Sequence, residues 1–139
     1  MQSNTEAVFS SDDESPNAMV ARAQALVPEL RRRQGATEKA GRVLPDAIQS
    51  LLAAGLYRVV QPKKFGGLEF GLDNFVRVAM TVASGCGSTG WVFSTGAQHQ
   101  WQIGLFPEEA QEEVWGEDPT ALAASSYAPT GVALAEGDG

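Results

Sequence analysis

The sequence is poor in the side chains that build disulfides and metal centres, with one cysteine and one histidine among its 139 residues. A lone Cys86 cannot form a disulfide within the chain, and a lone His99 leaves no cluster of Cys, His and carboxylate groups at metal-ligand spacing. We therefore expect no metal site. We expect Cys86 to be a small buried hydrophobic residue in a reducing compartment.

Positive charge and long apolar runs are also scarce. The net charge is −7, and the one arginine cluster, Arg31 to Arg33, has acidic neighbours, which argues against nucleic acid as a partner. No apolar run reaches the roughly 18 residues that a membrane span needs, and the amino terminus lacks a basic region followed by an apolar one. These absences predict a cytoplasmic protein without membrane contact.

Three regions follow from composition and periodicity. Residues 1–16 are polar and acidic, and we expect them to form a disordered tail. Residues 17–118 show helical periodicity, and we expect them to form an α-helical domain. Its predicted elements are helices over Asn17–Ala40, from Pro45 to the stop at Gly55, over Leu72–Ser84 and from Pro107 to Trp115, with an extended segment over Tyr57–Val60 and a glycine loop at Phe65–Gly67.

The last region, residues 119–139, predicts the beginning of a β-domain. Val132 to Ala135 has the pattern of a strand, and the turn residues after it have no returning strand. Folded proteins avoid unpaired sheet edges, so we expect the chain to be the first portion of a longer protein.

The stretch from Gly85 to Phe106 differs most from ordinary scaffold, and we expect one helix there. Trp91, Thr95 and His99 are spaced at i, i+4 and i+8, so one face offers an indole, a hydroxyl and an imidazole, and Trp101 faces away. We expect the apolar residues of the stretch to pack elsewhere: Val92, Phe93, Ile103, Leu105 and Phe106. Two interpretations stay open, a ligand pocket or a buried helix whose small residues let a neighbouring helix come close.

Several strings, taken in order, resemble a known family. They are Leu56-Tyr57-Arg58, Gln61-Pro62, Phe65-Gly66-Gly67, Cys86 to Val92, His99-Gln100-Trp101, Leu105-Phe106, Val114-Trp115-Gly116 and Ser125 to Gly131. From about Ala18 onward the chain resembles the amino-terminal part of the acyl-CoA dehydrogenase superfamily. More narrowly, it is similar to the flavin-dependent monooxygenase branch, the oxygenase components of two-component aromatic hydroxylases.

The resemblance implies a mainly α fold, with a helical amino-terminal domain followed by the start of a central β-domain. It also implies a homotetramer when the protein is full length, and a separate flavin reductase that supplies FMNH2 or FADH2. With molecular oxygen this flavin forms a C4a-hydroperoxide that hydroxylates a small aromatic, phenolic substrate. By itself, this chain would be inactive.

The resemblance also assigns roles to single residues. Trp91 matches a tryptophan beside the flavin ring, His99 a histidine that meets the substrate hydroxyl, and Ser125 a serine near substrate and flavin. Ser126 is expected to form a hydrogen bond close by. His99 and Ser125 are thus the expected catalytic residues, and Trp91, Ser125 and Ser126 the expected cofactor-binding ones.

Two other functions remain open. A true acyl-CoA dehydrogenase would bind oxidised FAD, but Ser125 to Gly131 lacks the Thr-Glu-Pro and Gly-Ser-Asp pattern usual in those enzymes. A helical interaction module without chemistry is the other alternative.

Overall fold

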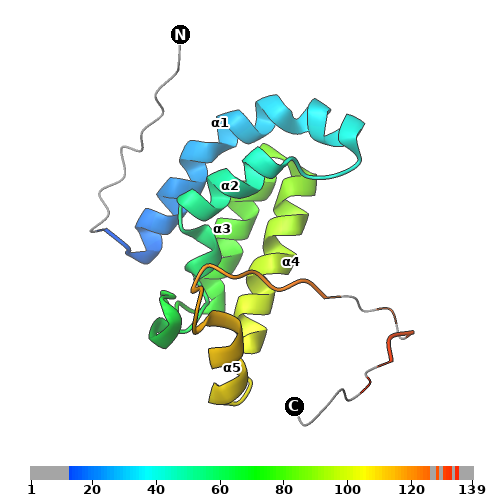
Figure 1. The fold of residues 1–139 in the computed structure, drawn as a ribbon. Helices are drawn as coiled ribbons and strands as arrows, with labels where there is room; N and C mark the ends of the chain where they lie inside the picture. The colour runs from blue at the N-terminus through cyan, green and yellow to red at the C-terminus, as the bar shows by residue number, and fades with distance from the viewer. Residues whose placement is uncertain (1–12, 126–127, 129, 133, 135–139) are drawn as a thin grey trace.

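The structure is a computed structural model that describes residues 13–125, 128, 130–132 and 134. These residues contain helices and loops and no strand, which confirms the predicted helical fold class (Figure 1). The elements are α1 (Pro16–Ala40), α2 (Pro45–Ala53), the 3-10 helices η1 (Leu56–Arg58) and η2 (Lys63–Phe65), α3 (Leu72–Gly85), α4 (Gly87–Ile103) and α5 (Glu108–Trp115). None of the helices in these described ranges has the length and apolar character needed to cross a bilayer.

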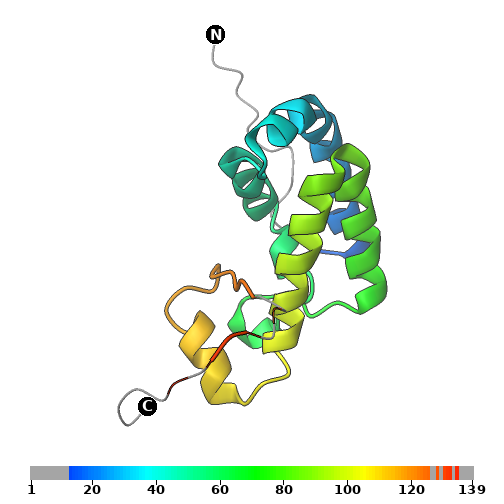
Figure 2. The same cartoon turned by 90° about the vertical axis from the view of Figure 1, so that its right-hand side faces the viewer.

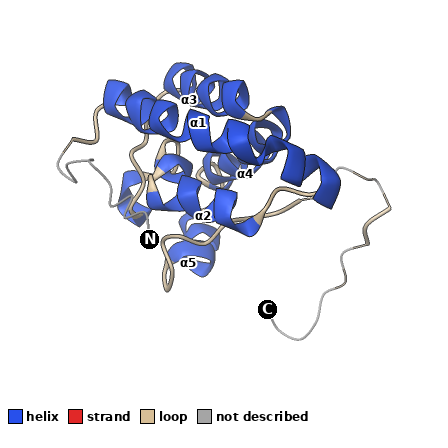
Figure 3. Ribbon diagram, turned by 90° about the horizontal axis from the view of Figure 1, so that it is seen from above, coloured by secondary structure: helices blue, strands red, loops and turns tan. Residues whose placement is uncertain are grey.

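Helix α3 packs against α1 on one side and against α4 on the other. The helices α3 and α4 lie side by side in Figure 2, and Figure 3 shows α1 next to α3. Two glycines allow this close packing. A Cβ atom on Gly90 would lie 2.5 Å from the Cα of Ala83, and one on Gly85 would lie 3.0 Å from the Cβ of Leu30. At these two positions the small residues serve helix contact, as the second interpretation of the stretch proposed.

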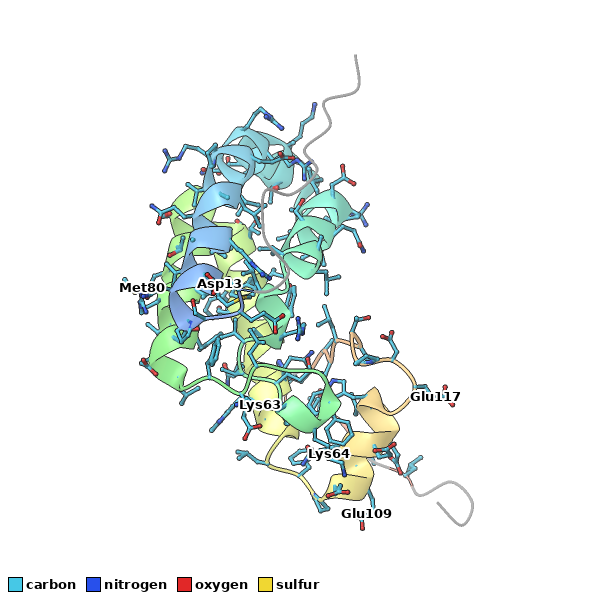
Figure 4. All side chains as sticks on the ribbon, turned by 90° about the vertical axis from the view of Figure 1, so that its left-hand side faces the viewer. Asp13, Lys63, Lys64, Met80, Glu109 and Glu117 are labelled. Atoms are coloured by element: carbon cyan, nitrogen blue, oxygen red, sulfur yellow. The ribbon has the colours of Figure 1, made fainter. Side chains whose placement is uncertain are left out.

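The first helix begins at Pro16, one residue earlier than predicted. The Ser15 hydroxyl accepts a hydrogen bond from the backbone N–H of Ala18 at 3.2 Å, which caps the helix. Residues 1–12 of the expected tail lie outside the described residues. The rest of it contacts the helical body, since Glu14 forms an ion pair with Arg58 at 2.7 Å and Asp13 lies near the start of α1 (Figure 4).

The prediction of an extended segment over Tyr57–Val60 is wrong, because these residues form a turn that begins with η1. Gly55 adopts φ 72°, and the N–H of Arg58 donates to its carbonyl at 3.1 Å. Leu56, Tyr57, Val59 and Val60 are all at most 4% exposed. An extended strand sends alternate side chains to opposite faces, so it could not bury this run in one core.

The predicted helix over Gly85–Phe106 is shorter than expected. Gly85 ends α3, Cys86 is extended with φ −157°, and α4 begins at Gly87. Cys86 is 2% exposed, as expected for a buried hydrophobic residue. The expectation of apolar packing holds for Phe93 and Ile103 but fails for three residues that are 40–65% exposed, because they project from the helical body: Val92, Leu105 and Phe106.

Helix α5 extends the body at one end. Trp115 packs with Phe65 and Ile103 in a small second core. Lys64, labelled in Figure 4, forms an ion pair with Glu108 at the start of α5. The chain then turns back across α4. The predicted strand over Val132–Ala135 lies partly outside the described residues, and so does the turn after it. Val132 and Leu134 are described, belong to no strand and are 80% and 84% exposed.

Candidate functional site

One face of α4 lines a cavity of about 360 Å³. Trp91, Thr95 and His99 all border it, as their spacing predicts, and Ser125 borders it from the segment that follows α5. The remaining lining is mostly apolar: Ile48, Tyr57, Val92, Gly96, Leu122, Ala123 and Ala124. Residues 26 positions apart in the sequence, His99 and Ser125, thus face one space.

His99 is 5% exposed and has a neighbour at each ring nitrogen. Nδ1 contacts the backbone carbonyl of Thr95, and Nε2 contacts the hydroxyl of Ser125. A carbonyl can only accept, so Nδ1 carries a proton, and this assigns the tautomer of a neutral ring. In that tautomer Nε2 has a free electron pair and accepts the Ser125 O–H. The ring is therefore oriented as a proton acceptor toward the cavity.

Trp91 and Thr95 contribute differently to this cavity. The Thr95 hydroxyl donates to the backbone carbonyl of Trp91 at 2.9 Å, so its proton is already used within the helix. The Trp91 side chain is 73% exposed at the edge of the cavity. An exposed indole can stack on a planar aromatic group and lose its contact with water, so the residue fits the flavin ring that the resemblance implies.

The segment that carries Ser125 is held by buried side-chain donors. Gln61 Nε2 donates to the carbonyl of Pro119 at 2.9 Å, and Gln100 Nε2 donates to that of Ala121 at 3.0 Å. Trp115 Nε1 donates to the Ala121 carbonyl as well, at 3.3 Å. Sequence reasoning assigned no role to these donors, although all three lie in strings that carry the resemblance. Only their burial next to a returning backbone identifies them.

A second cavity of about 310 Å³ adjoins these donors. Polar side chains border it, including Arg58, Gln61 and Gln100. Tyr57 lines it too, at 3% exposure, and its ring meets that of Phe93 edge-on with centroids 5.2 Å apart. Burial raises the pKa of the Tyr57 phenol to about 12, so its hydroxyl stays protonated at neutral pH.

The structure brings Trp91, His99 and Ser125 together around one space. Ser126 lies outside the described residues. The catalytic and cofactor-binding roles of these residues stay predictions. In the described part of the chain no three Cys, His, Asp or Glu side chains are grouped so that they could hold a metal ion.

Comparison with protein families gives one match that spans most of the chain. The family described as acyl-CoA dehydrogenase, N-terminal domain, matches residues 14–119. The chain is 43% identical over 109 residues to the oxygenase subunit HsaA of a flavin-dependent monooxygenase from Mycobacterium tuberculosis. It is 38% identical over 119 residues to the oxygenase component of p-hydroxyphenylacetate 3-hydroxylase from Acinetobacter baumannii. These matches cover 78% and 86% of the chain.

Solved structures show the same similarity. A crystal structure of the HsaA monooxygenase from M. tuberculosis superposes with a TM-score of 0.80 at 41% identity, covering 83% of this chain and 32% of that one. A 3-HSA hydroxylase from Rhodococcus sp. RHA1 gives 0.78 at 40% identity, covering 81% and 29%. The chain spans about 28% of the length of the two curated relatives named above.

Proposed function

The chain belongs to the acyl-CoA dehydrogenase N-terminal domain family. We propose that it is the amino-terminal part of an oxygenase component. The enzyme would be a two-component flavin-dependent monooxygenase that acts on a phenol. Similarity to relatives that carry such names supports this proposal. The proposal includes the partner reductase, FMNH2 or FADH2 with molecular oxygen, and the homotetramer. It also includes a β-domain that starts at residue 119, with Ser126 near the flavin.

The orientation of His99 is the observation that carries the proposal. Its Nδ1 is fixed by the Thr95 carbonyl, so Nε2 is left to accept a proton from a group in the cavity. A phenol with a pKa of about 10 costs roughly 4 kcal/mol to hold as phenolate at pH 7. A protonated imidazole about 4 Å away supplies roughly 4 kcal/mol at an effective dielectric constant near 20, before desolvation. His99 can therefore take the substrate proton and stabilise the more nucleophilic phenolate.

Ser125 and Trp91 supply orientation. The Ser125 hydroxyl already contacts Nε2, so it can be exchanged for the substrate hydroxyl or can bridge the two. Trp91 presents its indole at the edge of the same cavity, where it can stack on the flavin. When bound, reduced flavin activates oxygen for transfer to the ring. The rest of the cavity lining is mostly apolar, with Ile48 and Leu122 among it, and this suits an aromatic substrate.

Acyl-CoA dehydrogenation is less well supported. The family match by itself is compatible with it. The curated relatives named above are hydroxylases and monooxygenases, and the cavity presents a histidine suited to a phenolic hydroxyl. These two observations together favour oxygenation.

The test uses the complete reading frame that contains this chain, mixed with chemically reduced flavin, oxygen and phenol. Hydroxylated product is measured per oxygen consumed. We expect His99→Ala to consume oxygen while its product yield falls by about 100-fold or more, since general base catalysis contributes about that factor. Ser94→Ala, which removes a hydroxyl from α4 that does not line the cavity, is the matched control and should keep the wild-type yield. A wild-type protein that forms no hydroxylated phenol, or a His99→Ala variant with the full yield, would contradict the proposal.

A further inference from the structure

Tyr57 separates the two cavities. Within the described part of the chain it is the one residue that lines both. Consecutive residues divide between the two spaces: Ile48 and His99 border the first cavity, and Gln49 and Gln100 border the second. The cavities therefore lie side by side beneath α2, with the phenol ring of Tyr57 as the wall between them.

The wall is held in place on its α4 side. The Tyr57 ring meets Phe93 edge-on at an interplanar angle of 63°. It also lies against Gly96, where an added Cβ atom would be 3.1 Å from the ring carbon Cε1. Glycine at that position thus lets the ring approach the helix, and a 3% exposed ring in such contacts has little room to turn away.

The two spaces differ in chemistry. The first is mainly apolar apart from the polar groups near His99 and Ser125, which suits an aromatic ring. The second is lined by the Gln49 and Gln100 amides and the Arg58 guanidinium among others, and the buried Gln100 Oε1 has no hydrogen-bond partner in the described part of the chain. An uncharged polar group such as an alcohol can be hydrogen-bonded there, while an aromatic ring in the first cavity touches His99.

We propose that Tyr57 limits the length of the substrate. Its ring closes the aromatic cavity against long para substituents. The second cavity is a subsite for a polar substituent, and a smaller side chain at position 57 would open it. This inference rests on the proposed function, because it takes the first cavity as the phenol site. It extends that function from the reacting hydroxyl to the far end of the substrate.

The experiment compares two probes, phenol and 4-(4-hydroxybutyl)phenol, with the complete reading frame as catalyst. The measured quantity is kcat/KM for each probe. Wild type should prefer phenol. Tyr57→Leu should move the ratio of the two values toward the long probe by at least tenfold, which is the size expected for steric discrimination in a pocket. Tyr57→Phe, which keeps the wall and removes its hydroxyl, is the matched control and should keep the wild-type ratio.

A third variant tests where the new space comes from. Ala53 lines the second cavity and is exposed, so Ala53→Leu should partly fill that cavity without disturbing the core. In the Tyr57→Leu background it should cancel most of the gain for the long probe. Tyr57→Met has an unbranched, flexible side chain that adapts better to an irregular core, and it replaces Tyr57→Leu if circular dichroism shows that the latter is unfolded.

The outcomes separate the two proposals. If wild type hydroxylates neither probe, the proposed function itself fails. If wild type hydroxylates phenol but a folded Tyr57→Leu or Tyr57→Met variant keeps the wild-type ratio, the aromatic site stands and the role of Tyr57 is wrong. A Tyr57→Phe variant that shifts the ratio as far as Tyr57→Leu would also overturn it, because the hydroxyl rather than the wall would then select the substrate.

Discussion

Replacing Gln61 by leucine should loosen the segment that brings Ser125 to His99. Gln61 is 1% exposed, and its Nε2 donates to the carbonyls of Phe65 at 2.8 Å and Pro119 at 2.9 Å. Leucine is similar in size and apolar, so Gln61→Leu removes the two hydrogen bonds with little change in packing. The substitution therefore isolates the contribution of the amide.

The magnitude follows from the two acceptors. Each lost hydrogen bond costs about 1 kcal/mol net. The Phe65 residue is only 7% exposed, so its carbonyl loses its partner in a poorly hydrated place, whereas Pro119 is exposed and can be hydrated. A stranded carbonyl adds about 1 kcal/mol. We expect a loss of roughly 2 to 3 kcal/mol in the free energy of unfolding, which corresponds to about 10 °C in Tm for a chain of this size.

The assay is urea unfolding of the chain, followed by tryptophan fluorescence and by circular dichroism. Gln49→Leu is the matched control: it removes an amide from the lining of the same cavity, but that amide makes no hydrogen bond in the described part of the chain. It should cost less than about 0.5 kcal/mol. If Gln61→Leu loses no more stability than Gln49→Leu, the amide does not hold the segment and the reasoning is wrong.

Three further predictions concern stability. Gly67→Ala should lower the free energy of unfolding by about 3 kcal/mol or more, because its Cβ would lie 1.9 Å from the Gln61 carbonyl oxygen. In the control Gly87→Ala the new Cβ meets no atom within 4 Å, so Tm should shift little. Thermal melts that give the two variants equal Tm would refute this. Gly90→Ala should cost about 1 to 3 kcal/mol by pushing α4 from α3, and adding Ala83→Gly should recover part of it in urea titrations. Burial raises the pKa of Tyr57 to about 12, whereas the phenol of the unfolded chain titrates near 10. The free energy of unfolding should therefore be unaffected below about pH 10 and fall by roughly 1 to 2 kcal/mol as the pH rises toward 12. A Tyr57→Phe variant that loses as much over that range would contradict the assignment.

Local signals in the sequence predict the helical elements well. Proline at the start of α2, glycine at its end and the apolar periodicity of α1 and α3 act within one or two helical turns, so they can be recognised without the fold. The spacing of Trp91, Thr95 and His99 places them on one face for the same reason. It could not show what that face meets.

Local patterns failed where tertiary burial determines the backbone. Tyr57 to Val60 is predicted to be extended, but the side chains of Leu56, Tyr57, Val59 and Val60 all enter one core, so the chain turns instead. The glycines at 85 and 90 were compatible with either a ligand or a neighbouring helix. Only the position of Ala83 and Leu30 shows that helices fill both places.

The sequence by itself therefore determined the helices, the face that carries Trp91 and His99, and the resemblance from which a role for this face is predicted. The tertiary structure alone decided that Ser125 reaches His99, that the Gln61 amide holds the returning backbone 58 residues away, and that Tyr57 divides two cavities. The physical reason is the distance along the sequence over which the interactions act. Helix formation depends on hydrogen bonds four residues apart, whereas a cavity is the space left when distant segments pack, and no local pattern records it.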